Sequence, residues 1–309
     1  MPDPPSEDFA TRTNRLHPDE ADIDVALVRR LVAAQFPEIG DVTIRPVRST
    51  GTVNAIYRLG DHLYARLPRM AEWVASLETE WTLLPKLAPH LTLRIPTPVA
   101  MGSPAPGYPF SWAVYEWMDG KPYADELIDD EKQAANDLAR FVAELRGVEP
   151  VMGVPRAGRE PLAALDGETR EAIESAHEVI IDSRVATSAW ERALEAPPWQ
   201  GTPVWIHSDL LRPNILVDRG RLRAVIDFGG AGIGDPASDV IAAWSVFGPV
   251  GRLVFRRSLA VDDATYNRAR GIALHQAVMI IPYYKETNPD FVALAKRTIE
   301  QILADSATD

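Results

Sequence analysis

The chain contains no cysteine among its 309 residues. A disulfide framework, a thiolate metal site and a cysteine nucleophile are therefore all excluded. The first residues, Met1 to Asp8, also lack the basic start and the apolar core of a signal peptide. Since nothing directs the chain elsewhere, the sequence favours a cytoplasmic protein.

Long apolar runs and an excess of basic residues are also missing. Apolar stretches such as 277–281 are far shorter than the roughly 20 residues of a membrane helix, so no membrane partner is expected. The net charge is -12, whereas a nucleic-acid binder needs a basic surface, so no nucleic-acid partner is expected either. The acidity favours a cationic ligand only slightly, because many soluble proteins are acidic. The 46% hydrophobic content is enough for packed lobes and excludes a disordered chain.

The most informative segment runs from Trp205 to Asn214 and is followed by an Asp-Phe-Gly triplet at 227–229. Phosphoryl transfer from a nucleotide to a hydroxyl uses a carboxylate that accepts the hydroxyl proton, and Asp209 fits this role. Side-chain oxygens must also hold the magnesium ions that bridge the phosphates. Asn214, five residues after the base, and Asp227 stand at the positions that kinases use for this purpose. The segment predicts a Mg²⁺-dependent phosphoryl-transfer site.

Two short apolar runs, 215–217 and 222–226, lie between Asn214 and Asp227. The intervening residues, 218–221, are charged and include one glycine, which is typical of a hairpin turn. We therefore expect an antiparallel pair of strands that brings the two predicted metal ligands together.

The triplet His207-Ser208-Asp209 also invites comparison with a serine hydrolase. Three consecutive residues cannot form a relay of nucleophile, base and orienting acid, and no Gly-x-Ser-x-Gly elbow surrounds Ser208. We reject that interpretation. Each polar residue taken singly is explained as well by an ordinary loop position, but their coincidence at this spacing argues against chance.

Segment 205–239, with these motifs and a Gly-Asp-Pro-Ala-Ser-Asp run at 234–239, resembles the aminoglycoside phosphotransferase family, which includes macrolide phosphotransferases. The resemblance implies an α+β, bilobal, protein-kinase-like fold, in which a small N-terminal lobe with an antiparallel sheet plus a helix precedes a larger, mostly helical C-terminal lobe. The family usually has Gly where this chain has Ser208. It often reads Asp-Leu-His-Pro-Gly-Asn where this chain has Leu211-Arg212-Pro213. These departures leave the base and metal ligands in place and bear on the substrate.

Hydropathy patterns give a matching division of the chain. Residues 1–20 are rich in proline and acid and are predicted to be disordered or loosely packed. Residues 21–118 are predicted to form the nucleotide-binding lobe, and residues 119–309 the catalytic and acceptor-binding lobe. The first lobe is expected to contain a helix over 25–36, strands over 42–47, 53–59 and 63–67, a helix over 71–87 and a last strand over 110–118. Helices of the second lobe are expected over 129–146, 167–181, 186–195, 238–247, 262–284 and 290–303.

A cation on the third strand has to reach the nucleotide phosphates. Alternation along 63–67 puts Arg66 on the face opposite to the leucines, and its guanidinium binds phosphate, although protein kinases use Lys there. Glu80 borders the apolar side of the next helix and is the candidate to hold Arg66, with Glu78 as runner-up. Two exposed, unrelated side chains are the alternative.

Two loops complete the expected nucleotide site. Ser49, Thr50 and Gly51 occupy the place of the phosphate-covering loop, with a single glycine in the pattern, and a plain hairpin turn explains them equally well. The resemblance further implies that backbone groups of Glu116 and Met118 bond the purine. Because backbone recognition leaves little trace in side chains, the nucleotide is either ATP or GTP.

The acceptor is expected among the C-terminal helices. The candidates are Trp244, Tyr283, Tyr284 and Glu286, because aromatic faces and carboxylates suit a cationic sugar or a large lactone. Core packing is the alternative for the aromatics. Asp239 is assigned a structural role, either capping the next helix or bracing the catalytic loop.

These observations predict a kinase that transfers the γ-phosphoryl group of ATP or GTP to a hydroxyl of a small acceptor, first of all an aminoglycoside or macrolide antibiotic. A metabolite kinase of the choline, homoserine or sugar type is the nearer alternative, and a nucleotide-binding pseudokinase scaffold is the other. Asp209, Asn214 and Asp227 together favour an active enzyme. Arg66 alone leans towards the pseudokinase.

Overall fold

The computed structural model describes residues 20–47, 53–150, 153–177 and 182–306, so the segment 1–20 lies almost wholly outside it. Contacts within the chain define two compact units. The first comprises residues up to Val74 together with Val99–Tyr115, and the second comprises Ala75–Pro98 and Glu116–Asp309. Segment 75–98, which the sequence assigned to the nucleotide lobe, therefore groups with the C-terminal unit.

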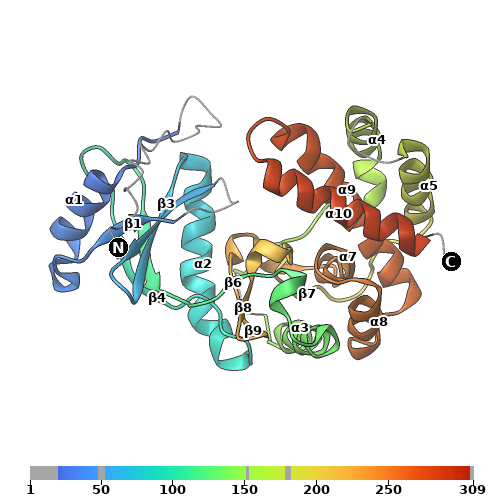
Figure 1. Ribbon diagram of the computed structural model, residues 1–309, viewed down its shortest axis with the longest axis horizontal. Helices are drawn as coiled ribbons and strands as arrows, with labels where there is room; N and C mark the ends of the chain where they lie inside the picture. Colours follow the sequence, from blue (N-terminus) through green and yellow to red (C-terminus); the bar gives the residue numbers. More distant parts are fainter. Residues whose placement is uncertain (1–19, 48–52, 151–152, 178–181, 307–309) are drawn as a thin grey trace, which may run out of the picture. The chain divides into compact units, whose positions relative to one another are not determined.

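A five-stranded sheet with the order β1-β2-β3-β5-β4 forms the centre of the first unit (Figure 1). The β2–β3 pair is antiparallel, with Leu59 opposite Leu63, and the chain reverses at Gly60, which adopts a positive φ of 57°. Glycine takes this conformation without a Cβ clash. The elements of this unit are α1 (Val25–Gln35), β1 (Ile44–Pro46), β2 (Asn54–Leu59), β3 (Leu63–Pro68), β4 (Pro98–Gly102) and β5 (Trp112–Glu116).

Helix α1 covers the sheet through one apolar stripe. Asp24 caps its start, since the Oδ1 atom accepts a hydrogen bond from the backbone N of Leu27 at 2.7 Å. Leu27 and Leu31 recur at helical spacing and pack into a buried cluster with Tyr57 and Trp112 of the sheet. This cluster gives the first unit a core of its own.

Helices build most of the second unit. The 22-residue helix α9 is buried along most of its length and packs against α10, α6, α5 and α4, and Figure 1 shows α9 and α10 side by side. The predicted helix 238–247 is divided into α6 and α7 at Ile241, and α8 was not predicted. The helices are α2 (Val74–Leu87), α3 (Glu131–Arg146), α4 (Asp166–Ser175), α5 (Ser183–Leu194), α6 (Ala237–Val240), α7 (Ala242–Ser245), α8 (Pro249–Ser258), α9 (Asp263–Tyr284) and α10 (Pro289–Ser306).

Two small sheets accompany these helices. β6 (Lys121–Pro122), β8 (Ile215–Asp218) and β9 (Arg221–Val225) form one, and β7 (Val204–Ile206) pairs with β10 (Gly232–Gly234) in the other. The β8–β9 connection is a two-residue turn at Arg219 and Gly220, which both have positive φ, 49° and 76°. Such a turn matches the twist of a tight antiparallel hairpin, so the hairpin predicted between the metal ligands is confirmed.

The observed elements agree with the α+β architecture predicted from the sequence, in which a strand-rich first unit precedes a helical second unit. Among the helices that the structure describes, none has the length and apolar character needed to cross a membrane.

Candidate active site

The predicted catalytic loop, residues 207–214, directly follows β7 and is fixed through its backbone. The backbone N of His207 donates to Oδ2 of Asp239 at 3.0 Å, and the N of Ser208 donates to Oδ1 at 2.8 Å. Asp239 on α6 therefore braces the loop, whereas the backbone N of Ala237, at the start of α6, donates to Oδ1 of Asp235 at 2.9 Å. Of the two structural roles considered for Asp239, the structure supports bracing.

Asp239 carries this brace in a fully buried position. Burial raises its pKa, while the guanidinium of Arg146 and the hydrogen bonds from the backbone N–H groups of Ser208 and His207 partly offset the effect. Arg146 is held beside it, because its Nη2 atom donates to the carbonyl of Pro236 at 2.7 Å. A buried carboxylate with two backbone donors and a cation nearby is a well-satisfied group, which suits a fixed support.

His207 joins the catalytic loop to the residue before Asp227. Its ring is buried, its Nδ1 atom lies 3.3 Å from the backbone N of Asp209, and its Nε2 atom lies 3.0 Å from the carbonyl of Ile226. Because Nδ1 accepts from an N–H group, the partners assign the proton to Nε2, which donates to the carbonyl. The ring also meets Phe228 edge to face at 4.6 Å. His207 thus connects Asp209 to Ile226 through the two nitrogen atoms of its ring.

Asp209 is half-buried, and each of its carboxylate oxygens accepts a hydrogen bond from an amide. Nε2 of Gln276 on α9 donates to Oδ1 at 2.7 Å, and Nδ2 of Asn214 donates to Oδ2 at 2.8 Å. Burial raises the pKa of Asp209, and the nearby Asp227 carboxylate raises it further. The Gln276 hydrogen bond and the charge of Arg159 act in the opposite direction. The carboxyl is therefore oriented and made more basic than usual.

Asn214 and Asp227 lie at the two ends of the β8–β9 hairpin. Nδ2 of Asn214 also donates to the backbone O of Asp209 at 2.9 Å, and the N of Ile226 donates to the O of Asn214 at 2.9 Å. Asp227 is exposed and adopts a left-handed conformation with φ 66° and ψ 67°. Asp tolerates this region better than most residues. The hairpin thus brings the end of one strand, with Asn214, beside the start of the Asp-Phe-Gly loop.

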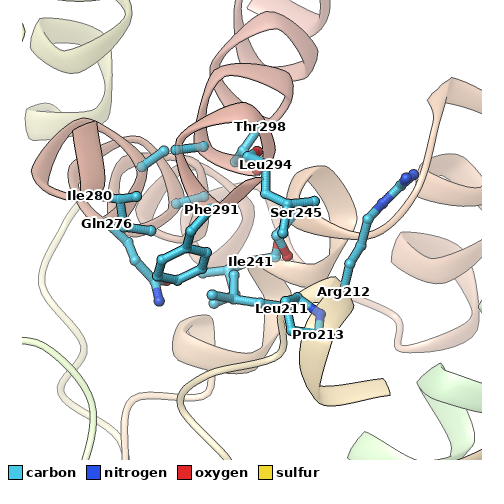
Figure 2. Close-up of a pocket in the computed structure, with 13 residues that line it drawn as sticks. Leu211, Arg212, Pro213, Ile241, Ser245, Gln276, Ile280, Phe291, Leu294 and Thr298 are labelled. Atoms are coloured by element: carbon cyan, nitrogen blue, oxygen red, sulfur yellow. Dashed lines mark hydrogen bonds between the residues drawn. The ribbon is translucent and has the colours of Figure 1, made fainter. Parts of the chain in front are cut away.

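A cavity of about 320 Å³ opens beside Asp209. Tyr283, Tyr284 and Phe291 contribute to its wall, together with Arg159 and Gln276. A second, apolar pocket of about 20 Å³ adjoins it (Figure 2) and has room for about one water molecule. Gln276 and Phe291 line both the cavity and the pocket. Of the two, only the larger cavity has the size to hold a small molecule.

Comparison with known proteins identifies the family. A sequence model of the phosphotransferase enzyme family matches residues 43–272, which include the loop, the hairpin and the Asp-Phe-Gly triplet. The chain belongs to this family. The prediction made from the motif segment is therefore confirmed at the level of the family.

Solved phosphotransferases share the fold. An aminoglycoside 2'-phosphotransferase in complex with GDP is 20% identical to this chain. The two structures superpose with a TM-score of 0.73 over 92% of this chain and 99% of that chain. The macrolide 2'-phosphotransferase of Brachybacterium faecium is 20% identical, with a TM-score of 0.57 over 87% of this chain and 98% of that chain. At these identities the similarity establishes the fold.

A curated relative is similar in sequence. The uncharacterized protein YcbJ of Bacillus subtilis (strain 168) is 28% identical over 202 residues, which are 59% of this chain and 62% of that protein. The match thus spans less than two thirds of the relative's length.

Arg66, which was predicted to reach the phosphates, and Glu80, which was predicted to hold Arg66, lie in different units of the chain. Arg66 on β3 is buried, and with the Asn54 amide oxygen turned towards it, Asn54 accepts from Nη2 and Nε at 3.0 Å each. Glu80 on α2 is fully buried. Because the two side chains belong to separate units, their pairing stays a prediction. The predicted loop Ser49 to Gly51 falls outside the described residues.

The predicted purine-binding segment follows β5. The backbone N of Glu116 donates to the carbonyl of Thr97 at 3.0 Å, and its side chain pairs with Arg94 at 3.5 Å. Met118 is buried in a cluster with Leu216 and Ala224 of the hairpin sheet. Nucleotide contacts of Glu116 and Met118 remain predictions.

Of the four acceptor candidates, two line the cavity beside Asp209 and two do not. Tyr283 and Tyr284 line the cavity beside Asp209. Trp244 is not part of that lining, since it is fully buried and its Nε1 atom donates to Asp305 at 3.0 Å. Glu286 is exposed and does not line the cavity either. Only the two tyrosines are therefore carried into the proposals below.

The residues that would hold magnesium fit that ion. Among the described residues no cluster of three or more His, Asp or Glu side chains is found. Mg²⁺ needs no such cluster, because it commonly binds one or two carboxylates plus substrate phosphates and water. The Nδ2 atom of Asn214 is used by Asp209, so the remaining polar atom of its side chain is the oxygen that a hard cation prefers.

Sequence reasoning missed three residues of the site. Gln276 lies 67 positions from Asp209, Arg159 lies in a loop, and Asn54 reaches Arg66 across the sheet. None of them stands in a motif. For Gln276 the one available signal was a polar amide at a position of α9 where the helical pattern predicts an apolar, buried residue.

Proposed function

We propose that the protein is a small-molecule kinase that transfers the γ-phosphoryl group of ATP or GTP to a hydroxyl of its acceptor. The observation that carries the proposal is Asp209, a basic, half-buried carboxylate oriented by two amides at the edge of a cavity. Family membership supports the same reaction class.

In the proposed reaction Asp209 acts as the general base. The acceptor hydroxyl donates a hydrogen bond to Asp209, which takes the proton while the hydroxyl oxygen forms a bond to the γ-phosphorus. The bond from that phosphorus to the β,γ-bridging oxygen breaks, and the nucleoside diphosphate leaves with that oxygen. Each carboxylate oxygen of Asp209 accepts one protein hydrogen bond and keeps a second lone pair, so the acceptor does not have to displace Gln276 or Asn214.

Asn214 and Asp227 would hold Mg²⁺, which, when bound, neutralises charge on the phosphates. Arg66, the backbone of Glu116 and Met118, and the loop from Ser49 to Gly51 are proposed to hold the nucleotide, with Glu80 orienting Arg66. His207 and Asp239 keep the catalytic loop in place through the hydrogen bonds described above.

The intact set of Asp209, Asn214 and Asp227 supports an active enzyme over a pseudokinase scaffold. A scaffold that only binds nucleotide has no chemical use for an oriented base, yet the structure fixes both oxygens of that base. Both the antibiotic and the metabolite acceptors considered from the sequence fit this reaction.

The direct test is a coupled nucleotide-consumption assay with purified protein and Mg²⁺. ATP and GTP are each combined with aminoglycosides, macrolides, small amino alcohols and hydroxy acids. We expect acceptor-dependent turnover that Asp209→Ala abolishes without weakening nucleotide binding, whereas Asp227→Ala weakens Mg-nucleotide binding as well. Full turnover in the Asp209 variant would exclude Asp209 as the base.

A further inference from the structure

One charged side chain in the cavity beside Asp209 has no role in the reaction proposed above. Arg159 lines this cavity and is exposed, and it forms no ion pair with the other residues that the structure describes. A guanidinium carries a positive charge and several N–H donors, which form strong hydrogen bonds with carboxylate or phosphate oxygens. One that lines a ligand cavity is therefore well suited to bind an incoming anion.

The carboxylates of the cavity lining also favour an anionic ligand over a cationic one. Within the described lining of the cavity Asp209 is the only carboxylate, and the proposed reaction reserves it for the hydroxyl. Glu160, next to Arg159 in the chain, is not part of the lining, and Glu168 lies 3.7 Å from His275 instead. A polycationic ligand would thus meet one arginine and no free carboxylate, which is poor electrostatic complementarity.

Arg159 and the base share one cavity. Both line it together with Gln276, whose Nε2 atom donates to Asp209 at 2.7 Å. A ligand whose hydroxyl contacts Asp209 can therefore place a second group near the guanidinium.

Apart from Gln276, which is bonded to Asp209, the rest of the described wall is apolar or aromatic. Tyr283 is 55% exposed and Met279 is 36% exposed, although both are large side chains with apolar surface. Tyr284 meets Tyr283 at 4.6 Å and Phe291 at 5.2 Å, each edge to face, so the aromatic rings support one another. Such a wall can cover an apolar body of the ligand and exclude water from it.

We propose that the acceptor is a hydroxyl compound that combines an apolar or aromatic body with an anionic group, and that Arg159 determines this specificity. The inference rests on the proposed kinase function and assigns its substrate class. It favours hydroxy acids or hydroxyl compounds with a phosphate over polycationic sugars.

The test uses three acceptors that share one aromatic body and differ in charge. These are 3-phenyllactate, which is anionic, 3-phenyl-1,2-propanediol, which is neutral, and phenylalaninol, which is cationic. Their binding to the full-length protein is measured by ligand-observed NMR and their phosphorylation by nucleotide consumption, with kanamycin as a polycationic comparison. The wild type is expected to prefer 3-phenyllactate over phenylalaninol by about tenfold.

Substitutions of Arg159 then assign the preference to this residue. Arg159→Gln should abolish the preference, Arg159→Glu should reverse it, and Arg159→Lys should retain part of it, all with an unchanged KM for the nucleotide. Arg156→Gln is the matched control, because it removes the same charge from an exposed residue three positions away that does not line the cavity.

Several outcomes would overturn the inference. They are a wild-type preference for phenylalaninol or kanamycin, no binding of any of the three matched compounds, or an equal loss for all three in Arg159→Gln. A changed nucleotide KM in that variant would instead place Arg159 on the transferred phosphoryl group. Failure of the kinase proposal is distinct, because it would show as no Mg-dependent nucleotide turnover with any acceptor, whichever compound binds.

Discussion

Ser208 offers the sharpest test of how the catalytic loop is held. It adopts a left-handed conformation with φ 68°, and its Oγ atom donates to the carbonyl of Gly230 at 2.7 Å. The left-handed region costs a non-glycine residue about 1–2 kcal/mol. The hydrogen bond contributes about 1 kcal/mol in the other direction. The serine therefore offsets its own backbone strain by tying the catalytic loop to the Asp-Phe-Gly loop.

Two substitutions separate these contributions. Ser208→Ala keeps the Cβ atom and loses the hydrogen bond, so the free energy of unfolding should fall by about 1 kcal/mol. Ser208→Gly loses the same bond and relieves the strain, but it gains about 0.5–1 kcal/mol of entropy in the unfolded chain, so its stability should stay close to that of the wild type. The glycine variant should thus exceed the alanine variant by about 1 kcal/mol.

The assay is thermal and urea unfolding of the three proteins side by side. A difference of about 1 kcal/mol corresponds to roughly 2–4 °C in Tm for domains of 150–250 residues. Turnover with one common acceptor reports whether Asp209 keeps its place. Equal stability of the two variants, or a glycine variant below the alanine variant, would show that position 208 carries no backbone strain.

Three further changes test other parts of the site. Asp239→Asn leaves one oxygen for two backbone N–H donors, so the free energy of unfolding should fall by about 1–3 kcal/mol and turnover should fall with it, as measured by urea unfolding and initial rates. Gln276→Leu removes a hydrogen bond that favours the charged carboxylate, so the pKa of Asp209, already raised, should rise further. Because the base acts when deprotonated, the acid limb of the kcat/KM profile should then move to higher pH, and an unchanged limb would contradict the orienting role of Gln276. Arg219→Asn gives the β8–β9 turn a residue that tolerates positive φ and should raise stability by about 0.5–1 kcal/mol in thermal unfolding, with no gain expected if that turn is unstrained.

The sequence predicted those parts of the structure in which local patterns determine the outcome. The hairpin from Asn214 to Asp227 follows from two apolar runs around a glycine, and the structure pairs them with Ile215 opposite Val225. The brace from Asp239 was one of two open alternatives, and only the fold decides between them, because the loop it supports lies about thirty residues away.

Other elements carry no clear local signal. Helix α8 begins at Pro249, directly after Gly248, and contains Gly251, so the start of this helix resembles a turn in sequence. Strand β4 is an edge strand between a proline and a glycine. Gln276 and Arg159 reach the cavity through tertiary packing, and no short-range pattern encodes such contacts.

The two amides that hold Asp209 have a consequence for how the enzyme responds to its surroundings. Gln276 and Asn214 neither gain nor lose protons over the range in which proteins stay folded, and each donates only from its amide nitrogen. The donors that orient the carboxylate therefore keep their own charge state when the pH changes. A change of pH therefore alters the fraction of Asp209 that is deprotonated, whereas the two amide donors stay neutral.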